Sequence, residues 1–310
     1  MTNREKYIQL CEQESLPLHA QAWWWEQSTV GDGWDAVLWE NAAGEVEAAM
    51  PYRIGRRMHL RAMLMPTHTF YHYIYISPKA QADIYPRIAR ELESLCREKH
   101  IGWVRLQGWY PQPLLEAMHA QGFASQERVT YRIEDLPARK DISKLFSENK
   151  RRQLHKATDL QLVRLDADTF YAFHKTCLAQ QGKVIDYSSE WASALLPEAV
   201  RRGNGQLLAA QDKEGTLLAA LFLAWDDQYA YYLLPTYLPQ KKNSGAVAWL
   251  TAQALGIAHE KGLHFDFEGS MTPSIASSYQ QFGGKPVTYH RIEKFYNPLL
   301  RIAVQLKERS

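Results

Sequence analysis

The stretch that decides the fold runs from residue 229 to residue 268 and reads YAYYLL (Tyr229–Leu234), LPQKKN (Leu238–Asn243), a helix beginning at Ser244-Gly245, and HFDFE (His264–Glu268). The first and last segments are short, apolar and aromatic, which is typical of buried strands. A strand, a helix and a second strand in this order predict parallel strands joined by a right-handed crossover. Ligands bind beyond the carboxyl ends of such strands, near the amino end of the helix. We therefore expect the functional site at the 234–243 loop and at residues 268–270.

Length and composition limit the class of protein. A chain of 310 residues with 46% hydrophobic residues can fill two domain cores. A net charge of +2 provides no large basic field, so DNA is not an expected partner. Three cysteines, far apart in the sequence, predict a cytoplasmic protein without disulfides, and no metal site is expected from the cysteine or histidine spacing. The longest apolar run, Leu217–Trp225, is far shorter than the ~20 residues of a membrane span, so neither a transmembrane segment nor a signal peptide is expected.

One pattern of elements occurs twice. Both halves run through helix, strand, glycine, short helix, glycine and strand, and Gly269 and Gly283 repeat the spacing of Gly108 and Gly122. The repetition predicts a tandem duplication of one α/β (α+β) unit. A linker-like segment at residues 135–141 places the boundary, which gives a first domain at 1–137 and a second at 138–310 that ends in a helix at 298–310.

Several motifs resemble those of a known family. They are Asn149-Lys150-Arg151-Arg152 followed by Lys156-Ala157, Phe265–Ser270 followed by Tyr279 and Phe282-Gly283, and, in the first half, Leu16-Pro17-Leu18, Trp23-Trp24 and Ala49–Tyr52. Together they resemble the FemAB-like transferases, which are tandem proteins of the GNAT acyltransferase superfamily, over nearly the whole chain.

The resemblance implies two GNAT-like domains with mixed central sheets. It implies an enzyme, an N-acyltransferase that moves an acyl or aminoacyl group to an amine. The donor would be acyl-CoA or aminoacyl-tRNA, with no tightly bound cofactor, and the acceptor a small molecule or a peptidoglycan precursor. Transfer RNA is then a further partner. A duplicated GNAT fold that only binds a ligand or a partner is the alternative.

The loop before the main helix is the expected donor site. A helix amino end offers free N–H groups and a positive dipole for phosphate, and lysines add charge. The loop departs from the glycine-rich loop of acyl-CoA users, since Asn243 or Ser244 takes the middle glycine position. A capped helix with a solvated loop is the alternative interpretation. The residues expected to bind the donor are Leu234, Lys241, Lys242, Asn243, Ser244 and Gly245.

Two carboxylates are the expected catalytic groups. Strand alternation places Asp266 and Glu268 on one face, away from the core. We expect Glu268 to accept the proton of the amine, Asp266 to orient the acceptor and Tyr279 to supply a proton to the leaving group. A structural salt bridge, for instance with Arg291, is the alternative for the acids, and a core position is the alternative for Tyr279.

The remaining expectations concern substrate binding. The cations of the 147–156 helix suit phosphates or an acidic substrate, although a solvated helix face is equally expected. The expected substrate-binding residues are Arg151, Arg152, Lys183 in a loop over the sheet, Tyr232 and Ser270. In the first half, Arg105 and Gln107 replace the two acids, which predicts a non-catalytic domain that builds the cleft or binds the acceptor.

Overall fold

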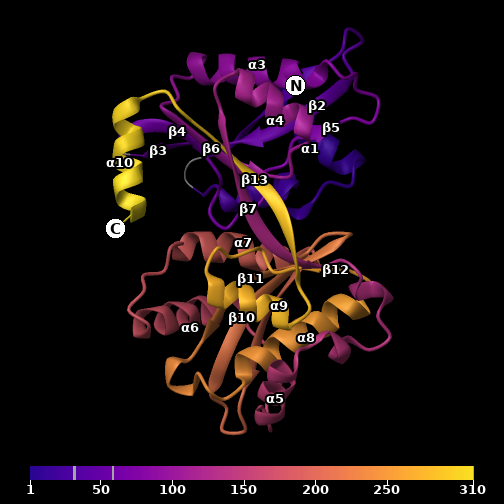
Figure 1. The fold of residues 1–310 in the computed structure, drawn as a ribbon, viewed down its shortest axis with the longest axis vertical. Helices are drawn as coiled ribbons and strands as arrows, with labels where there is room; N and C mark the ends of the chain where they lie inside the picture. The colour runs from indigo at the N-terminus through magenta and orange to yellow at the C-terminus, as the bar shows by residue number, and fades with distance from the viewer. Residues whose placement is uncertain (31–32, 58, 310) are drawn as a thin grey trace. The chain divides into compact units, whose positions relative to one another are not determined.

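The chain folds into two compact units (Figure 1). The computed structural model describes residues 1–30, 33–57 and 59–309. The first unit combines Met1–Arg128 with Tyr289–Ser310, and the second consists of Val129–Thr288. The sequence placed the boundary at 137/138 and gave the whole C-terminal segment to the second domain. In the structure, Tyr289–Ser310 belong to the first unit instead.

The elements of the first unit are α1 (Asn3–Gln13), α2 (Ala22–Ser28), β1 (Asp35–Glu40), β2 (Val46–Tyr52), β3 (Ile54–Arg57), β4 (Leu60–Leu64), β5 (Tyr75–Ile76), α3 (Ile84–Glu98), β6 (Trp103–Gly108), α4 (Gln112–Ala120), β13 (Lys285–Phe295) and α10 (Pro298–Arg309). A mixed sheet has the order β3-β4-β6-β13, with β4 parallel to β6 and the other neighbours antiparallel. Strands β1, β2 and β5 form a separate antiparallel sheet. Helix α3 buries Ile88 and Leu92 in the same cluster as Val104 and Leu106 of β6.

The elements of the second unit are β7 (Ala124–Ile133), α5 (Glu148–Lys156), β8 (Gln161–Arg164), α6 (Ala167–Gln180), α7 (Ser189–Arg201), β9 (Gly205–Gln211), β10 (Leu217–Trp225), β11 (Tyr229–Tyr237), α8 (Ala246–Glu260), β12 (His264–Asp266) and α9 (Pro273–Gln281). Its sheet has the order β7-β12-β11-β10-β9-β8, and only β11 and β12 are parallel among the described pairs. Both units therefore have the mixed sheets that the sequence predicted.

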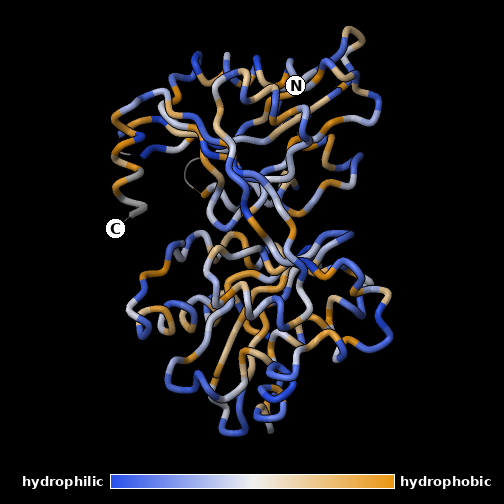
Figure 2. The backbone as a smooth tube through the Cα atoms, in the orientation of Figure 1, coloured by the Kyte–Doolittle hydropathy of each residue, from blue (hydrophilic) through white to orange (hydrophobic). Residues whose placement is uncertain are grey.

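The core of the second unit lies on both faces of its sheet. Strand β10 is buried at every position except Leu217, and it is part of the hydrophobic centre of this unit (Figure 2). Leu221 and Leu223 pack in one cluster with α8, whereas Phe222 faces the other way, toward Ala199 of α7. Because strand side chains alternate, one sheet supports α8 on one face and α7 on the other.

Each unit obtains its last strand from the other half of the sequence. Strand β7 follows the first helix–strand–helix repeat but pairs with β12 of the second unit, Asp266 opposite Arg132. Strand β13 follows the second repeat but pairs with β6 of the first unit, His290 opposite Gly108. This exchange is the reason why the compact units differ from the boundaries drawn on the sequence.

The predicted elements are present with one important change. The last strand of the deciding stretch was expected to reach Glu268, but β12 ends at Asp266. Glu268 has a φ of 61°, which lies in the left-handed region and cannot continue a strand. The two acids therefore do not share a strand face. Among the described residues, no helix is long and apolar enough to cross a membrane.

Candidate active site

The parallel strands of the second unit separate beside the loop at which the sequence predicts the functional site. Strands β11 and β12 pair only from Tyr229 to Tyr231, opposite His264 to Asp266, although β11 continues to Tyr237. The pairing of β11 with β10 shifts register opposite the 220–222 segment, and Leu234 adopts a φ of 50°. An extra residue in one strand bends it, and such bulges are common beside active sites. The opening between β11 and β12 is therefore built into the backbone.

Asp266 is the anchor of the turn at the end of β12. Its side chain is fully buried, and Oδ2 forms an ion pair with Nε of Arg132 at 2.6 Å. Its Oδ1 accepts hydrogen bonds from Oγ1 of Thr130 at 2.6 Å and from the backbone N–H of Glu268 at 2.8 Å. Arg132 is therefore an ion-pair partner of Asp266. These contacts engage both oxygens of Asp266 with the protein itself.

Glu268 occupies a strained and buried position. Glu268 is 3% exposed. Its backbone has a left-handed conformation, and its N–H donates a hydrogen bond to Oδ1 of Asp266. A non-glycine residue in this region costs about 1–3 kcal/mol and is found mostly at functional sites. Burial, and next the charge of Asp266, raise the pKa of the Glu268 carboxyl well above its usual range, while Arg132 acts in the opposite direction. The carboxyl therefore retains its proton to a higher pH than an exposed glutamate does.

Gly269 completes this turn by allowing a close approach of the backbone. Its φ is 72°, and a Cβ atom at this position would lie 2.6 Å from the carbonyl oxygen of Val129. Glycine is thus required here both for the left-handed conformation and for space. Consecutive left-handed residues redirect the chain from β12 toward α9.

An aromatic layer lies next to the turn. Tyr279 stacks on Phe267 with ring centroids 4.5 Å apart, and Tyr232 packs edge-on against both rings. The Tyr232 hydroxyl bonds to Oγ1 of Thr251 in α8 at 3.1 Å, so the side chain belongs to the core. Burial raises the pKa of the Tyr279 hydroxyl, and the charges of Tyr232, Glu268 and Asp266 act in the same direction. Tyr279 is therefore within electrostatic reach of both acids.

Helix α5 is fixed against α8 and α9. Ser147 caps α5 by accepting from the backbone N–H of Lys150, and Nζ of the buried Lys150 donates to Oγ of Ser278 at 2.8 Å. At the other end of α5, the Gln153 carbonyl oxygen would lie 2.4 Å from a Cβ atom on Gly245. Gly245 is the residue that precedes α8, and its φ is 79°. Only glycine lets α5 approach the amino end of α8 this closely.

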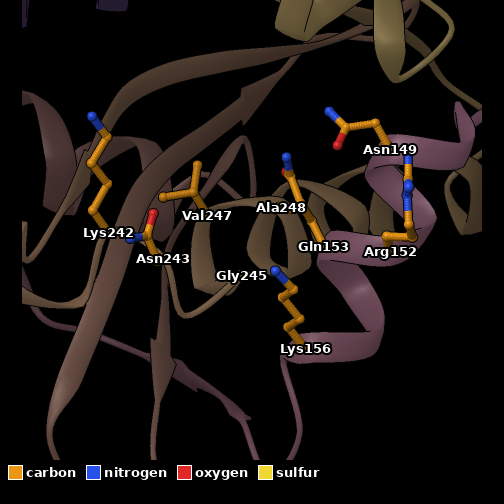
Figure 3. Close-up of a pocket in the computed structure, with 9 residues that line it drawn as sticks. All are labelled: Asn149, Arg152, Gln153, Lys156, Lys242, Asn243, Gly245, Val247 and Ala248. Atoms are coloured by element: carbon orange, nitrogen blue, oxygen red, sulfur yellow. The ribbon is translucent and has the colours of Figure 1, made fainter.

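A pocket of 560 Å³ opens at this junction (Figure 3). Figure 3 shows Arg152 and Lys156 projecting from α5 on one side of Gly245, and Lys242 from the loop on the other. All three cations are exposed. The full lining consists of Asn149, Arg152, Gln153, Lys156, Lys242, Asn243, Gly245, Val247 and Ala248. Cations around a helix amino end form an anion-binding environment.

The structure separates the predicted site residues into three groups. Arg152, Lys242, Asn243 and Gly245 line the pocket, whereas Leu234, Lys241, Ser244 and Arg151 are not among the described residues that line it. Asp266, Glu268 and Tyr279 gather at the end of β12.

The third group, Lys183, Ser270 and Tyr232, is not among the described residues that line the pocket, although Ser270 follows the turn at Glu268 and Tyr232 packs against Tyr279. Lys183 is exposed in the loop after α6, where Gln181 Nε2 donates to the Tyr237 carbonyl at 3.4 Å. Ser270 Oγ accepts from the N–H of Thr272, and Tyr232 is a core residue. Among the described residues, no group of His, Cys, Asp or Glu side chains could hold a metal ion.

Arg132, Thr130 and Lys156 were not predicted as site residues. Arg132 and Thr130 reach Asp266 from β7, which comes from the first half of the sequence, and no local spacing connects them. Lys156 could have been found, because Asn149, Arg152 and Lys156 recur at the three- and four-residue spacing of one helix face.

Comparisons with known proteins agree with this architecture. Residues 144–275 match the family model described as an acetyltransferase (GNAT) domain. The fold is similar to that of FemX, with a TM-score of 0.67, 12% identity, and coverage of 94% of this chain and 96% of that one. A search of curated proteins found no match.

Two further structures are similar over nearly the whole chain. One is a tandem GNAT protein from the clavulanic acid biosynthesis pathway, with a TM-score of 0.61, 12% identity, and coverage of 95% of this chain and 94% of that one. The other is the C-terminal domain of a putative lysylphosphatidylglycerol synthetase from Agrobacterium fabrum, with a TM-score of 0.60, 12% identity, and coverage of 98% and 95%. These likenesses confirm the predicted tandem GNAT fold. The chain therefore has the fold of these tandem GNAT structures, and the part of it that matches the acetyltransferase (GNAT) domain model lies within the second unit.

Proposed function

We propose that the second unit transfers an acyl or aminoacyl group from a phosphate-bearing donor to an amine. The observation that carries the proposal is the pocket at the amino end of α8. Cations from α5 and from the loop before α8 line it, and Gly245 gives the two helices room to approach each other there. Acyl-CoA is the first donor to test, and aminoacyl-tRNA is the second. A small molecule or a peptidoglycan precursor would supply the amine.

The pocket would hold the phosphate groups of the donor. Arg152 and Lys156 provide charge from α5, Lys242 provides it from the loop, and Asn149 adds an amide. Gly245 has no side chain that could cap α8, and Ser244 Oγ accepts a hydrogen bond from the backbone N–H of Ala246 at 3.3 Å. Phosphate at such a helix end gains hydrogen bonds from backbone N–H groups as well as attraction to the dipole.

The separated strands would hold the reactive end of the donor. Strand β11 leaves β12 after Tyr231, and the backbone around Leu234 and Pro235 is no longer in register with β10. Backbone groups freed from a sheet ladder can orient a carbonyl and stabilise the negative charge that develops on its oxygen. In this arrangement Leu234 contributes through its backbone.

Glu268 would be the base. The nitrogen of the amine attacks the donor carbonyl, the new C–N bond forms, and the bond from carbon to sulfur or oxygen breaks. The amine loses a proton to the Glu268 carboxylate, and the leaving thiol or hydroxyl gains one from Tyr279. A raised pKa makes the ionised Glu268 a stronger base and brings its pKa closer to that of an amine. The rate then rises with pH as Glu268 loses its proton.

Asp266 would act through Glu268 instead of on the acceptor. Its Oδ1 accepts a hydrogen bond from the backbone N–H of Glu268 at 2.8 Å, and its side chain is held in place by Arg132 and Thr130. Its negative charge also favours the protonated form of Glu268. We therefore assign Asp266 a positioning role, which replaces the acceptor-orienting role expected from sequence.

Calorimetric titration with acetyl-coenzyme A and with aminoacyl-tRNA tests the donor site. We expect the chain to bind one of them and the double variant Arg152→Ser/Lys156→Ser to bind it at least about tenfold more weakly, since two charge-assisted contacts are lost. Lys213→Ser, which removes an exposed lysine of the same unit, is the matched control and keeps full affinity. If neither donor binds, the alternative of a non-catalytic binding module replaces the proposal.

A further inference from the structure

Helix α10 presents an apolar stripe to solvent. Leu299, Ile302 and Leu306, defined here as the apolar stripe, are 74%, 56% and 64% exposed. Their three- and four-residue spacing places them on one side of the helix. Scattered exposed apolar residues are ordinary, but three large ones aligned on one helix face form a patch of the kind that contacts a partner.

The opposite side of α10 already has its packing partners. Leu300 is 3% exposed and lies in a cluster with Ala62 of β4 and Trp103 of β6, and Val304 packs against the same cluster. Figure 1 shows α10 beside β3 and β4, and Figure 2 shows hydrophobic residues recurring along it. The helix is therefore held to the first unit by one apolar side while the apolar stripe remains outside.

A basic hairpin lies next to this helix. The β3–β4 hairpin exposes Arg56, Arg57 and Arg61, and the sequence from residue 53 to residue 64 contains no acidic residue. Arg57 pairs with Leu60, which packs against the cluster under α10, so Arg57 lies on the face that the helix covers, whereas Arg56 and Arg61 pair with each other and lie on the other face. The sequence of α10 itself has three cations, Arg301 among them, and one carboxylate.

We propose that α10 and the basic hairpin form a docking surface for a bilayer that contains anionic phospholipids. Apolar side chains on an interfacial helix enter the boundary between headgroups and acyl chains, and nearby arginines contact anionic headgroups. The twelve residues of α10 are fewer than the ~20 that span a bilayer, so the helix lies in the plane of the surface.

The charge pattern selects this partner over two others. A second copy of the chain seated on the same face would bring two arginine hairpins together, and like charges oppose that contact. The phosphates of a nucleic acid would pair with the arginines, but they would not bury the apolar stripe. An anionic bilayer complements both features at once.

Flotation with vesicles of equal parts phosphatidylglycerol and phosphatidylcholine tests the proposal on the full chain. We expect the chain to float with these vesicles, and much less with pure phosphatidylcholine or at high salt. The triple variant Leu299→Ser/Ile302→Ser/Leu306→Ser should bind at least about tenfold more weakly because most of the inserting apolar surface is gone. Arg57→Ser should weaken binding about fivefold, whereas Arg56→Ser, on the opposite face of the hairpin, should weaken it less.

Matched variants separate docking from general effects. Val184→Ser removes a 90% exposed apolar side chain and Lys213→Ser an exposed cation, both in the second unit, and neither should change flotation. The substituted side chains are exposed, so the thermal unfolding midpoint should stay unchanged. Unaltered flotation of the triple variant overturns the proposal. The proposal is also overturned if the wild-type chain does not float with anionic vesicles but is a dimer in solution, and the triple variant is a monomer.

Discussion

The two units contain the same strand–helix–strand arrangement and use its open end differently. In the first unit β4 runs parallel to β6 with α3 between them in sequence, and in the second β11 runs parallel to β12 with α8 between them. In each, a glycine without room for a side chain lies at the end of the second strand or shortly after it: Gly108 is the last residue of β6, and Gly269 follows the end of β12. The shared frame makes the residues beyond the strands directly comparable.

In the first unit the chain itself fills the opening. Beyond the end of β4, the backbone N–H of His72 donates to the Gln107 carbonyl at 2.6 Å, and Gln107 Nε2 donates to the Phe70 carbonyl. A Cβ atom on Gly108 would lie 2.0 Å from the carbonyl oxygen of His72. Arg105, which stands where the second unit has Asp266, forms an ion pair with Glu293.

In the second unit the corresponding place carries acids and leads to α8. Asp266 turns inward to Arg132, and Glu268 follows it in a left-handed turn. The loop after β11 continues into α8 and does not return along β12. The comparison teaches that parallel strands end side by side in both halves, and that local sequence decides whether another segment of the chain adds to that end, as in the first unit, or the strands stay unpaired beyond Tyr231, as in the second.

The largest expected effect contrasts Glu268 with its counterpart Gln107. Glu268→Gln should lower turnover at least about 100-fold, the usual range for loss of a general base, while Gln107→Ala leaves it unchanged. Release of free thiol from acetyl-coenzyme A with a panel of amines measures this. Equal loss in both variants would show that the first unit also takes part in the reaction.

The ion pairs of the two units should differ in their contribution to stability. Asp266 is fully buried, so Asp266→Ala breaks a buried ion pair and should cost about 3–5 kcal/mol of unfolding free energy. Glu293 and Arg105 remain 24% and 20% exposed, so Glu293→Ala should cost about 1 kcal/mol. Urea denaturation compares the variants, and similar costs would contradict the assigned difference in burial.

Two glycines of the second unit test the junction of α5 with α8. Gly245→Ala should weaken donor binding, because its Cβ would displace the Gln153 carbonyl, and should add about 1–3 kcal/mol of backbone strain. Gly182 has a similar φ of 69° and nothing within 4 Å of a Cβ, so Gly182→Ala isolates the strain alone. Donor affinity measured by calorimetry should fall only for Gly245→Ala.

The smallest expected effect is a displacement of the pH profile. Asp266→Asn removes the neighbouring negative charge that raises the pKa of Glu268, so this pKa should fall. The rate depends on ionised Glu268, so its rise should move to lower pH in this variant. Arg105→Gln in the first unit should leave the profile unchanged. A profile that stays in place for Asp266→Asn would remove Glu268 from its role as the base.

Much of the fold was readable from the sequence because its signals are local. Apolar runs predicted β11 and β12, and the repeated glycine spacing predicted the duplication. The resemblance in Phe265–Ser270 and in the 149–157 segment predicted the GNAT fold. The exchange of β7 and β13 was not predicted, because strand pairing across the chain has no mark in local periodicity.

The candidate site stays a prediction, and the sequence did not reveal the contacts of its residues. Alternation correctly pointed Phe265 and Phe267 toward the core cluster, yet it failed at Glu268, where the backbone turns left-handed. That turn depends on a hydrogen bond to Asp266 and on room beside Val129, which only the folded chain supplies. Arg132 stayed unnoticed for the same reason.

The exchanged strands also set an order for assembly during synthesis. The first unit is translated first, yet its sheet lacks β13 until the ribosome has passed residue 295. The second unit, by contrast, has β7 available before any of its other strands is made. The second unit, which carries Asp266 and Glu268, therefore has all strands of its sheet before the first unit has received β13.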